Sequence, residues 1–274
     1  MSILIRAAAK VFSVLPAGLS TAIMLKFSPV LPLISSRHRT RFRLLKQLAG
    51  PNGTISYGPF AGMRYYKYAA GSQLLPKYAG TYELELRSVL DRIIELNPDI
   101  IVDVGSAEGY YVVGLARRLT AAKILAFDID RTANSLCGRL AAANSVSDRV
   151  QLCGLCSPAT LENAIFKAKR PLVICDVEGA EDKLLRPDET PSLSRSHILV
   201  ELHDSQNAGV STRIRERFDA THEIETIADA ERHPSDFPPE LNFTPQEQQL
   251  AMDEGRQARQ DWFFMTPRAV SRPL

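Results

Sequence analysis

Short apolar runs alternate with amphipathic segments from Tyr82 to Ile227, and this alternation limits the possible folds more than any other feature of the chain. The apolar runs predict five strands, which are Ile100–Val104, Lys123–Phe127, Arg149–Leu152, Pro171–Cys175 and His197–Leu202. Segments with one apolar stripe predict helices before and between them, at 84–96, 110–119, 131–143, 157–168, 179–185 and 211–218. Strands that alternate with helices form βαβ units, so we predict a doubly wound α/β fold with a mostly parallel sheet buried on both faces.

Two further strands are predicted near the C-terminus, at His222–Ile227 and Trp262–Met265. A proline-rich loop and a helix separate them, and Thr244-Pro245-Gln246-Glu247 has the form of a capping box at the start of that helix. We therefore predict an N-terminal extension at 1–80 and one domain at 81–274, with an insertion at about 228–260. An insertion of this length is either a lid over a substrate site or a plain surface excursion.

Charge is distributed unevenly along the chain, although the net charge of the 274 residues is only +2. Residues 1–82 contain 11 Lys and Arg and no acid, and the remainder contains 22 Lys and Arg and all 31 Asp and Glu. A basic arm on an acidic body suggests an anionic partner for the arm, or docking of the arm onto its own body. The arm at 1–46 combines basic and apolar residues, so peripheral contact with an anionic membrane is one expectation and packing on the domain is the other.

The longest uncharged run of the arm, Val11–Leu25, has 15 residues and contains Pro16. A membrane-spanning helix needs about 20 apolar residues, so we expect no span there. No small-residue cleavage motif follows the run, and the expectation is a cytoplasmic protein.

The four cysteines include Cys153 and Cys156 in C-x-x-C spacing, but no second ligand pair accompanies them. Ordinary packing is therefore expected for these thiols rather than a zinc site or a redox pair.

The segment Asp103–Gly109 joins the first predicted strand to the following helix. Ligands of open parallel sheets bind beyond the carboxyl ends of the strands, where a helix N-terminus attracts negative charge. The glycines Gly105 and Gly109 would let the backbone approach a ligand where a Cβ would collide. The pattern is D-x-G-x-x-x-G, not the dinucleotide pattern G-x-G-x-x-G, and its acid suits the ammonium group of an amino acid.

A second acid, Asp128, ends the next strand and is placed to bind a ribose diol. An amino acid joined to a ribose is S-adenosylmethionine, which we therefore predict as the cofactor. The alternative is a tight strand–helix turn with a capping acid.

These residues resemble the cofactor site of class I S-adenosylmethionine-dependent methyltransferases. The later segment Asp176-Val177-Glu178-Gly179-Ala180-Glu181 resembles the FkbM-type branch of that family. The resemblance implies a seven-stranded Rossmann-like sheet with an antiparallel last strand, and O-methylation of a small-molecule or sugar hydroxyl. It also implies that the methionine portion contacts Asp103, Gly105, Ser106 and Gly109, and that the ribose contacts Asp128. Cys156 falls where many members of the family carry an acid or small polar residue near the adenine.

Catalytic candidates lie at the ends of the fourth and fifth predicted strands. His203 has the side chain whose ordinary pKa lies nearest neutrality, so it is a candidate base, with Asp176 and Glu178 beside it. Glu201, two residues before His203 on the same strand face, is expected to orient the imidazole. The alternative is that Asp176 and Glu178 cap the helix that follows. Carboxylates beside a histidine could also hold a divalent metal, but no ligand spacing supports this, and no metal site is predicted.

Two other functions stay open. One is a protein that binds S-adenosylmethionine without turnover. The other is a nucleic-acid methyltransferase anchored by the basic arm; the chain lacks an N-P-P-Y-like motif after the fourth strand, so nucleic acid is not the expected partner.

Overall fold

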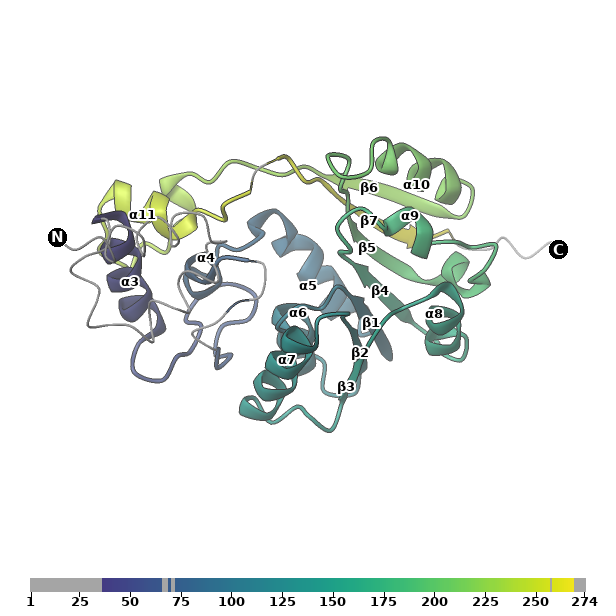
Figure 1. Ribbon diagram of the computed structural model, residues 1–274, viewed down its shortest axis with the longest axis horizontal. Coiled ribbons are helices and arrows are strands. Elements are labelled where there is room, and N and C mark those ends of the chain that lie inside the picture. Colours follow the sequence, from purple (N-terminus) through teal and green to yellow (C-terminus); the bar gives the residue numbers. More distant parts are fainter. Residues whose placement is uncertain (1–35, 66–68, 70–71, 257, 269–274) are drawn as a thin grey trace, which may run out of the picture. The chain divides into compact units, whose positions relative to one another are not determined.

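The computed structural model (Figure 1) describes residues 36–65, 69, 72–256 and 258–268. A seven-stranded sheet is its central element. The strands are β1 (Ile100–Val104), β2 (Lys123–Phe127), β3 (Val150–Cys153), β4 (Pro171–Cys175), β5 (His197–Glu201), β6 (His222–Ile227) and β7 (Trp262–Pro267). Their order across the sheet is β3-β2-β1-β4-β5-β7-β6.

Strands β1 to β5 pair in parallel, and β7 lies antiparallel to both β5 and β6. This is the predicted fold class, a mostly parallel seven-stranded sheet with an antiparallel last strand. The registers align Val104 with Cys175 and Cys175 with Val200. The carboxyl ends of β1, β4 and β5 therefore meet at one edge of the sheet.

Helices cover both faces of the sheet. They are α5 (Arg87–Leu96), α6 (Tyr110–Arg118), α7 (Arg131–Ala143), α8 (Pro158–Ile165), α9 (Glu181–Leu184) and α10 (Val210–Phe218), with 3-10 turns at η2 (Leu84–Leu86) and η3 (Pro191–Arg195). Figure 1 shows α6 beside α7 near β2 and β3, and α8 and α10 elsewhere along the sheet. Val102 and Val104 pack with residues of α8 and α10, while Ile101, which precedes Val102, is fully buried on the opposite face. Burial on both faces explains why these strands are almost continuously apolar.

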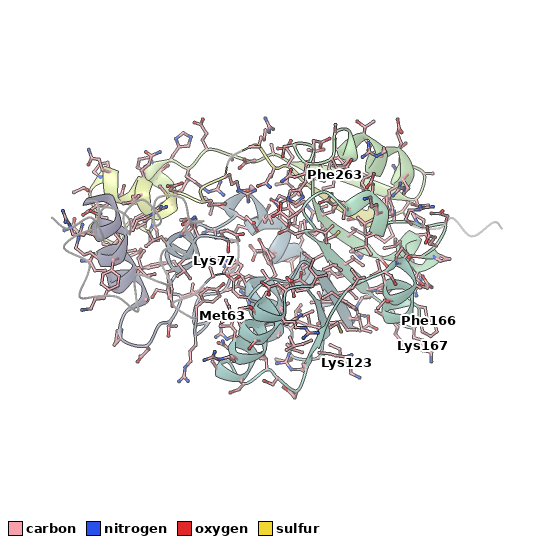
Figure 2. All side chains as sticks on the ribbon, viewed as in Figure 1. Met63, Lys77, Lys123, Phe166, Lys167 and Phe263 are labelled. Atoms are coloured by element: carbon pink, nitrogen blue, oxygen red, sulfur yellow. The ribbon has the colours of Figure 1, made fainter. Side chains whose placement is uncertain are left out.

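Helices α5, α8 and α9 differ from the predicted bounds, and α5 begins at Arg87 because 84–86 forms the 3-10 turn η2. Helix α8 ends at Ile165 rather than near Ala168, and Phe166 and Lys167 lie at its outer end (Figure 2), where Phe166 is exposed. Helix α9 begins at Glu181 rather than at Gly179. The cause is the backbone, because Glu178 (φ +51°) and Gly179 (φ +97°) adopt left-handed conformations that no α-helix contains.

The chain divides into two compact units. The sheet unit comprises Glu85–Ala230 and the described residues from Ala258 on. The N-terminal unit comprises the described residues up to Leu84 together with Glu231–Arg256, so it includes most of the predicted insertion. Its helices are α3 (Ser36–Ala49), α4 (Leu74–Ala79) and α11 (Pro245–Met252), with a 3-10 turn η4 at Pro234–Asp236. The capping box predicted at Thr244 and Glu247 is present at the start of α11.

Basic residues of the arm pair with acids of the insertion inside the N-terminal unit. Arg41 lies 3.1 Å from Asp253, and Arg43 pairs with Glu247. These contacts favour docking of the arm's end onto the protein's own acids. The rest of the predicted membrane-binding arm, residues 1–35, lies outside the described residues, so contact with an anionic membrane stays a prediction. Among the described residues, no helix has the length and apolar character needed to cross a bilayer.

A largely buried network of charges joins the two chain segments of the N-terminal unit. Glu254 is 7% exposed and accepts hydrogen bonds from Arg232 at 2.6 Å and from Arg256 at 3.1 Å. Arg256 also lies 3.2 Å from Glu83, which is 3% exposed. Removing one member of such a buried network leaves a buried charge without its opposite charge. This lowers the stability of the protein more than the loss of an exposed ion pair does.

We predict that Glu254→Ala lowers the free energy of unfolding by about 3 kcal/mol, because Arg232 and Arg256 would stay buried without their shared acceptor. The control is Glu225→Ala, since Glu225 and its partner Arg92 are both about half exposed. An exposed pair contributes about 0–1 kcal/mol. Urea unfolding of both variants measures the difference, and equal losses would contradict a structural role for the network.

Candidate functional site

The carboxyl edge of β1, β4 and β5 carries the candidate site. Strand β1 pairs with β2 on one side and with β4 on the other, so the chain connections diverge at β1 and β4. Open α/β sheets bind ligands at this kind of switch point. Gly105 and Asp176 follow β1 and β4 directly, and Glu201 ends β5 beside them.

The predicted glycine loop joins β1 to α6. Gly105 and Ser106 donate their backbone N–H groups to the Phe127 carbonyl at 2.9 and 3.1 Å, which holds the loop against the end of β2. Gly109 is the N-cap of α6 and adopts φ +93°. The first turn of α6 therefore starts at the sheet edge, with its positive dipole end directed toward the site.

Both loop glycines are required by the protein's own packing, a reason that the sequence interpretation did not foresee. A Cβ at Gly105 (φ +84°) would lie 1.6 Å from the Asp176 carbonyl oxygen. A Cβ at Gly109 would lie 2.6 Å from the Cys137 sulfur. Backbone contact of either glycine with a cofactor stays a prediction.

Asp128 fastens the loop to the end of β2. Its Oδ2 accepts a hydrogen bond from the Ala107 N–H at 2.8 Å, and its Oδ1 accepts one from the Asp130 N–H at 2.8 Å. The side chain is half-buried, and a carboxylate has about four lone-pair sites, so capacity for further donors remains. A contact with a ribose diol fits this capacity and stays a prediction.

The other three predicted cofactor residues differ in their surroundings. Asp103 is buried at the end of β1. Ser106 is also buried, and its hydroxyl has no hydrogen-bond partner among the residues that the structure describes. Cys156 follows β3 and is half-buried, with Cys153, against the apolar core, as expected for ordinary packing. Burial raises the pKa of the Cys156 thiol to about 12, so it remains uncharged at neutral pH.

The predicted catalytic residues come together around one imidazole. We call Asp176, Glu178, Glu181, Glu201 and His203 the His203 cluster. His203 is fully buried, and its Nδ1 lies 2.6 Å from Oε1 of Glu181, which is fully buried as well. Its Nε2 lies 3.6 Å from Asp176 Oδ1, 3.5 Å from Glu178 Oε2 and 3.5 Å from Glu201 Oε2.

The surroundings of His203 act on its pKa in opposite directions. Burial disfavours the charged imidazolium and lowers the pKa. The hydrogen bond to Glu181 and the negative charges of Glu201, Glu181 and Glu178 outweigh burial, so the pKa is raised above its ordinary value.

Neither Asp176 nor Glu178 caps a helix, although capping was the alternative explanation for them. Helix α9 has Ala180 as its N-cap, and no side chain caps it. The left-handed backbone at Glu178 and Gly179 turns the chain so that the Glu178 carboxylate faces His203.

Glu181 is the residue of the site that the sequence interpretation missed. It orients the imidazole, a role that we had expected for Glu201. Its signal was present as the last acid of Asp176-Val177-Glu178-Gly179-Ala180-Glu181, but only the folded turn shows that this acid points at His203.

No family model matches the chain, and no curated protein sequence matches it. Solved structures with a similar fold include the O-methyltransferase TomG from Streptomyces achromogenes in complex with SAM, at 11% identity over 91% of this chain and 97% of that one (TM-score 0.47). Another is an O-methyltransferase from Bacillus cereus in complex with SAH, at 13% identity over 90% and 98% (TM-score 0.46). The METTL16 MTase domain matches at 11% identity over 84% and 80% (TM-score 0.49). At these identities and TM-scores, the matches carry no argument about what this chain does.

We predict that Gly105→Ala lowers the free energy of unfolding by roughly 2–5 kcal/mol, from the left-handed backbone and the overlap with the Asp176 carbonyl. Gly154→Ala is the control, because a Cβ there meets no atom within 4 Å. Its expected change is within about 0.5 kcal/mol. Denaturant unfolding measures both, and a Gly105→Ala protein as stable as the control would contradict the packing role.

Proposed function

We propose that this protein is an S-adenosylmethionine-dependent methyltransferase that methylates a hydroxyl oxygen of a small molecule or sugar. One observation carries the proposal. A glycine loop fastened by Asp128 lies at the switch point of the sheet, and a cluster of carboxylates around His203 lies at the ends of the neighbouring strands. The first feature suits a cofactor that joins an amino acid to a ribose, and the second suits an acceptor that must lose a proton.

The residues present fit this cofactor. The buried Ser106 hydroxyl lacks a partner within the described part of the chain, which is costly unless a ligand or water supplies one. With Asp103, Gly105 and Gly109 it would hold the methionine portion, and Asp128 would hold the ribose. Ile129, next to Asp128, is 79% exposed and Leu155 is 74% exposed. With the uncharged Cys156 they offer apolar contacts that suit an adenine ring.

S-adenosylmethionine, when bound, supplies an electrophilic methyl group, so the protein's own task is to orient the acceptor and remove its proton. Asp176, Glu178 and His203 are the proposed acceptor-side residues. Glu178 is 73% exposed and can meet an incoming hydroxyl, whereas His203 is fully buried behind it. The cluster takes up the proton that leaves the hydroxyl as the new bond to carbon forms. Glu181 holds the imidazole in one orientation throughout.

The His203 cluster favours methyl transfer over cofactor binding alone, since a protein that only binds the cofactor has no need of a proton acceptor. Anchoring of nucleic acid by the arm is not favoured, because Arg41 and Arg43 already pair with Asp253 and Glu247. The acceptor is therefore expected among small molecules and glycans.

We predict that Asp128→Ala weakens the binding of S-adenosylhomocysteine at least tenfold. Hydrogen bonds to a charged group contribute about 1.5–3 kcal/mol each, and the loop also loses its fastening at Ala107. Asp130→Ala is the control: it removes the N-cap of α7, which accepts a bond from Thr132, and should leave affinity unchanged. Calorimetry decides, and equal affinity of wild type and Asp128→Ala would refute the cofactor site.

We predict that His203→Asn reduces kcat by roughly 10²–10⁴-fold, the usual contribution of proton transfer, while S-adenosylhomocysteine affinity stays near that of wild type. The acceptor is first identified by incubating the protein with methyl-labelled S-adenosylmethionine and fractionated small-molecule and glycan extracts. Turnover and affinity are then measured separately. Near-normal turnover would remove His203 from the mechanism, and label in no fraction would favour binding without turnover.

A further inference from the structure

The Nε2 atom of His203 belongs to a fully buried side chain and has no hydrogen-bond partner among the described residues. Three carboxylate oxygens, from Asp176, Glu178 and Glu201, surround it at 3.5–3.6 Å. Hydrogen bonds between nitrogen and oxygen are about 2.7–3.2 Å long, so these distances are too long for direct bonds.

The other ring nitrogen fixes the tautomer of a neutral imidazole. Nδ1 lies 2.6 Å from Glu181 Oε1, and an ionised carboxylate only accepts hydrogen bonds, so Nδ1 carries the proton. Nε2 then presents a lone pair toward three carboxylate oxygens. The Nε2 lone pair and the three carboxylate oxygens repel one another when no hydrogen bond joins them. A cation placed among these atoms would stabilise the arrangement.

We propose that Asp176, Glu178 and His203 bind a divalent cation through Asp176 Oδ1, Glu178 Oε2 and His203 Nε2. These three ligand atoms all lie within 4.8 Å of one another. Ligand atoms at about 2.1 Å from an ion in tetrahedral arrangement are about 3.4 Å apart, close to the observed separations from Nε2. One imidazole with two carboxylates suits Mn²⁺ or Zn²⁺ better than Ca²⁺, which takes oxygen ligands. The sequence raised a divalent metal beside the histidine as an alternative but gave no ligand spacing to support it, because the ligands follow two different strands.

The surroundings of these ligands are those of a catalytic metal site. Glu181 accepts the Nδ1 proton and so orients the imidazole, the arrangement by which carboxylates commonly support metal-bound histidines. Asp176 is 35% exposed and Glu178 73% exposed, so the ion keeps positions for water or another oxygen ligand. If the proposed methyl transfer holds, an acceptor hydroxyl that binds the ion loses its proton more readily to a carboxylate of the His203 cluster, since the ion then occupies Nε2.

The binding test uses the full-length chain without an affinity tag, stripped of metal by a chelator and dialysed. Titration with Mn²⁺, followed by electron paramagnetic resonance, should show one bound ion per chain. Titration with Co²⁺ should give visible absorption bands that Zn²⁺ abolishes by competition. Absence of uptake of all three ions by folded protein would overturn the proposal.

Substitutions locate the ion. His203→Asn and Glu178→Gln should each weaken Mn²⁺ binding at least tenfold. Because Glu178 is 73% exposed, the second variant should keep the fold intact. Glu181→Gln should weaken binding roughly 10–100-fold by loosening the imidazole. Asp204→Asn is the matched control, because Asp204 follows His203 but bonds to Ser211 instead of the cluster. A loss in Asp204→Asn equal to that in Glu178→Gln would overturn the assignment and indicate attraction by general negative charge.

Titration of the same preparations with S-adenosylhomocysteine separates this proposal from the proposed function. Mn²⁺ uptake without S-adenosylhomocysteine binding would support the cation site and refute the methyltransferase proposal. S-adenosylhomocysteine binding without uptake of any of the three ions would leave the methyltransferase proposal standing and refute the cation site.

Discussion

The backbone pairing of β1 with β4 is the interaction on which the rest of the site depends. Asp176 donates its N–H to the Val104 carbonyl at 2.9 Å, so the pairing continues one residue beyond β4. This bond holds the Asp176 carbonyl where any side chain at Gly105 would collide with it. The glycine loop and the acid of β4 are therefore fixed at the same sheet edge, by backbone rather than by side-chain contacts.

The two halves of the candidate site have opposite electrostatic character. The N-terminus of α6 presents the positive end of a helix dipole, and Asp128 fastens the loop before it. The His203 cluster concentrates carboxylates around a single buried imidazole. A site with both characters suits a reaction in which one partner is bound by donors and the other must lose a proton. The strained backbone at Glu178 is consistent with this, because left-handed backbone conformations of residues other than glycine cluster at functional sites.

The uneven charge of the chain has a structural counterpart in the N-terminal unit. The acid-free arm supplies Arg41 and Arg43, and the insertion between β6 and β7 supplies Asp253 and Glu247 as their partners. Glu254 adds the largely buried network with Arg232, Arg256 and Glu83. Segments far apart in the sequence thus form one unit, and the pairs Arg41–Asp253, Arg43–Glu247 and Glu83–Arg256 join them.

The sequence by itself determined the sheet unit, because each strand and helix carries a local pattern that its burial requires. The alternation of apolar runs placed β1, β2, β4 and β6 at their observed bounds, and the glycine loop and Asp128 followed from their positions after β1 and β2. Helices α3 and α4 lacked a pattern strong enough to predict them. Only the tertiary structure decided that Gly105 is needed for Asp176 and that Glu181, not Glu201, orients His203. These facts depend on strand register and on the left-handed turn at Glu178, which join residues through space and leave no periodic trace in the chain.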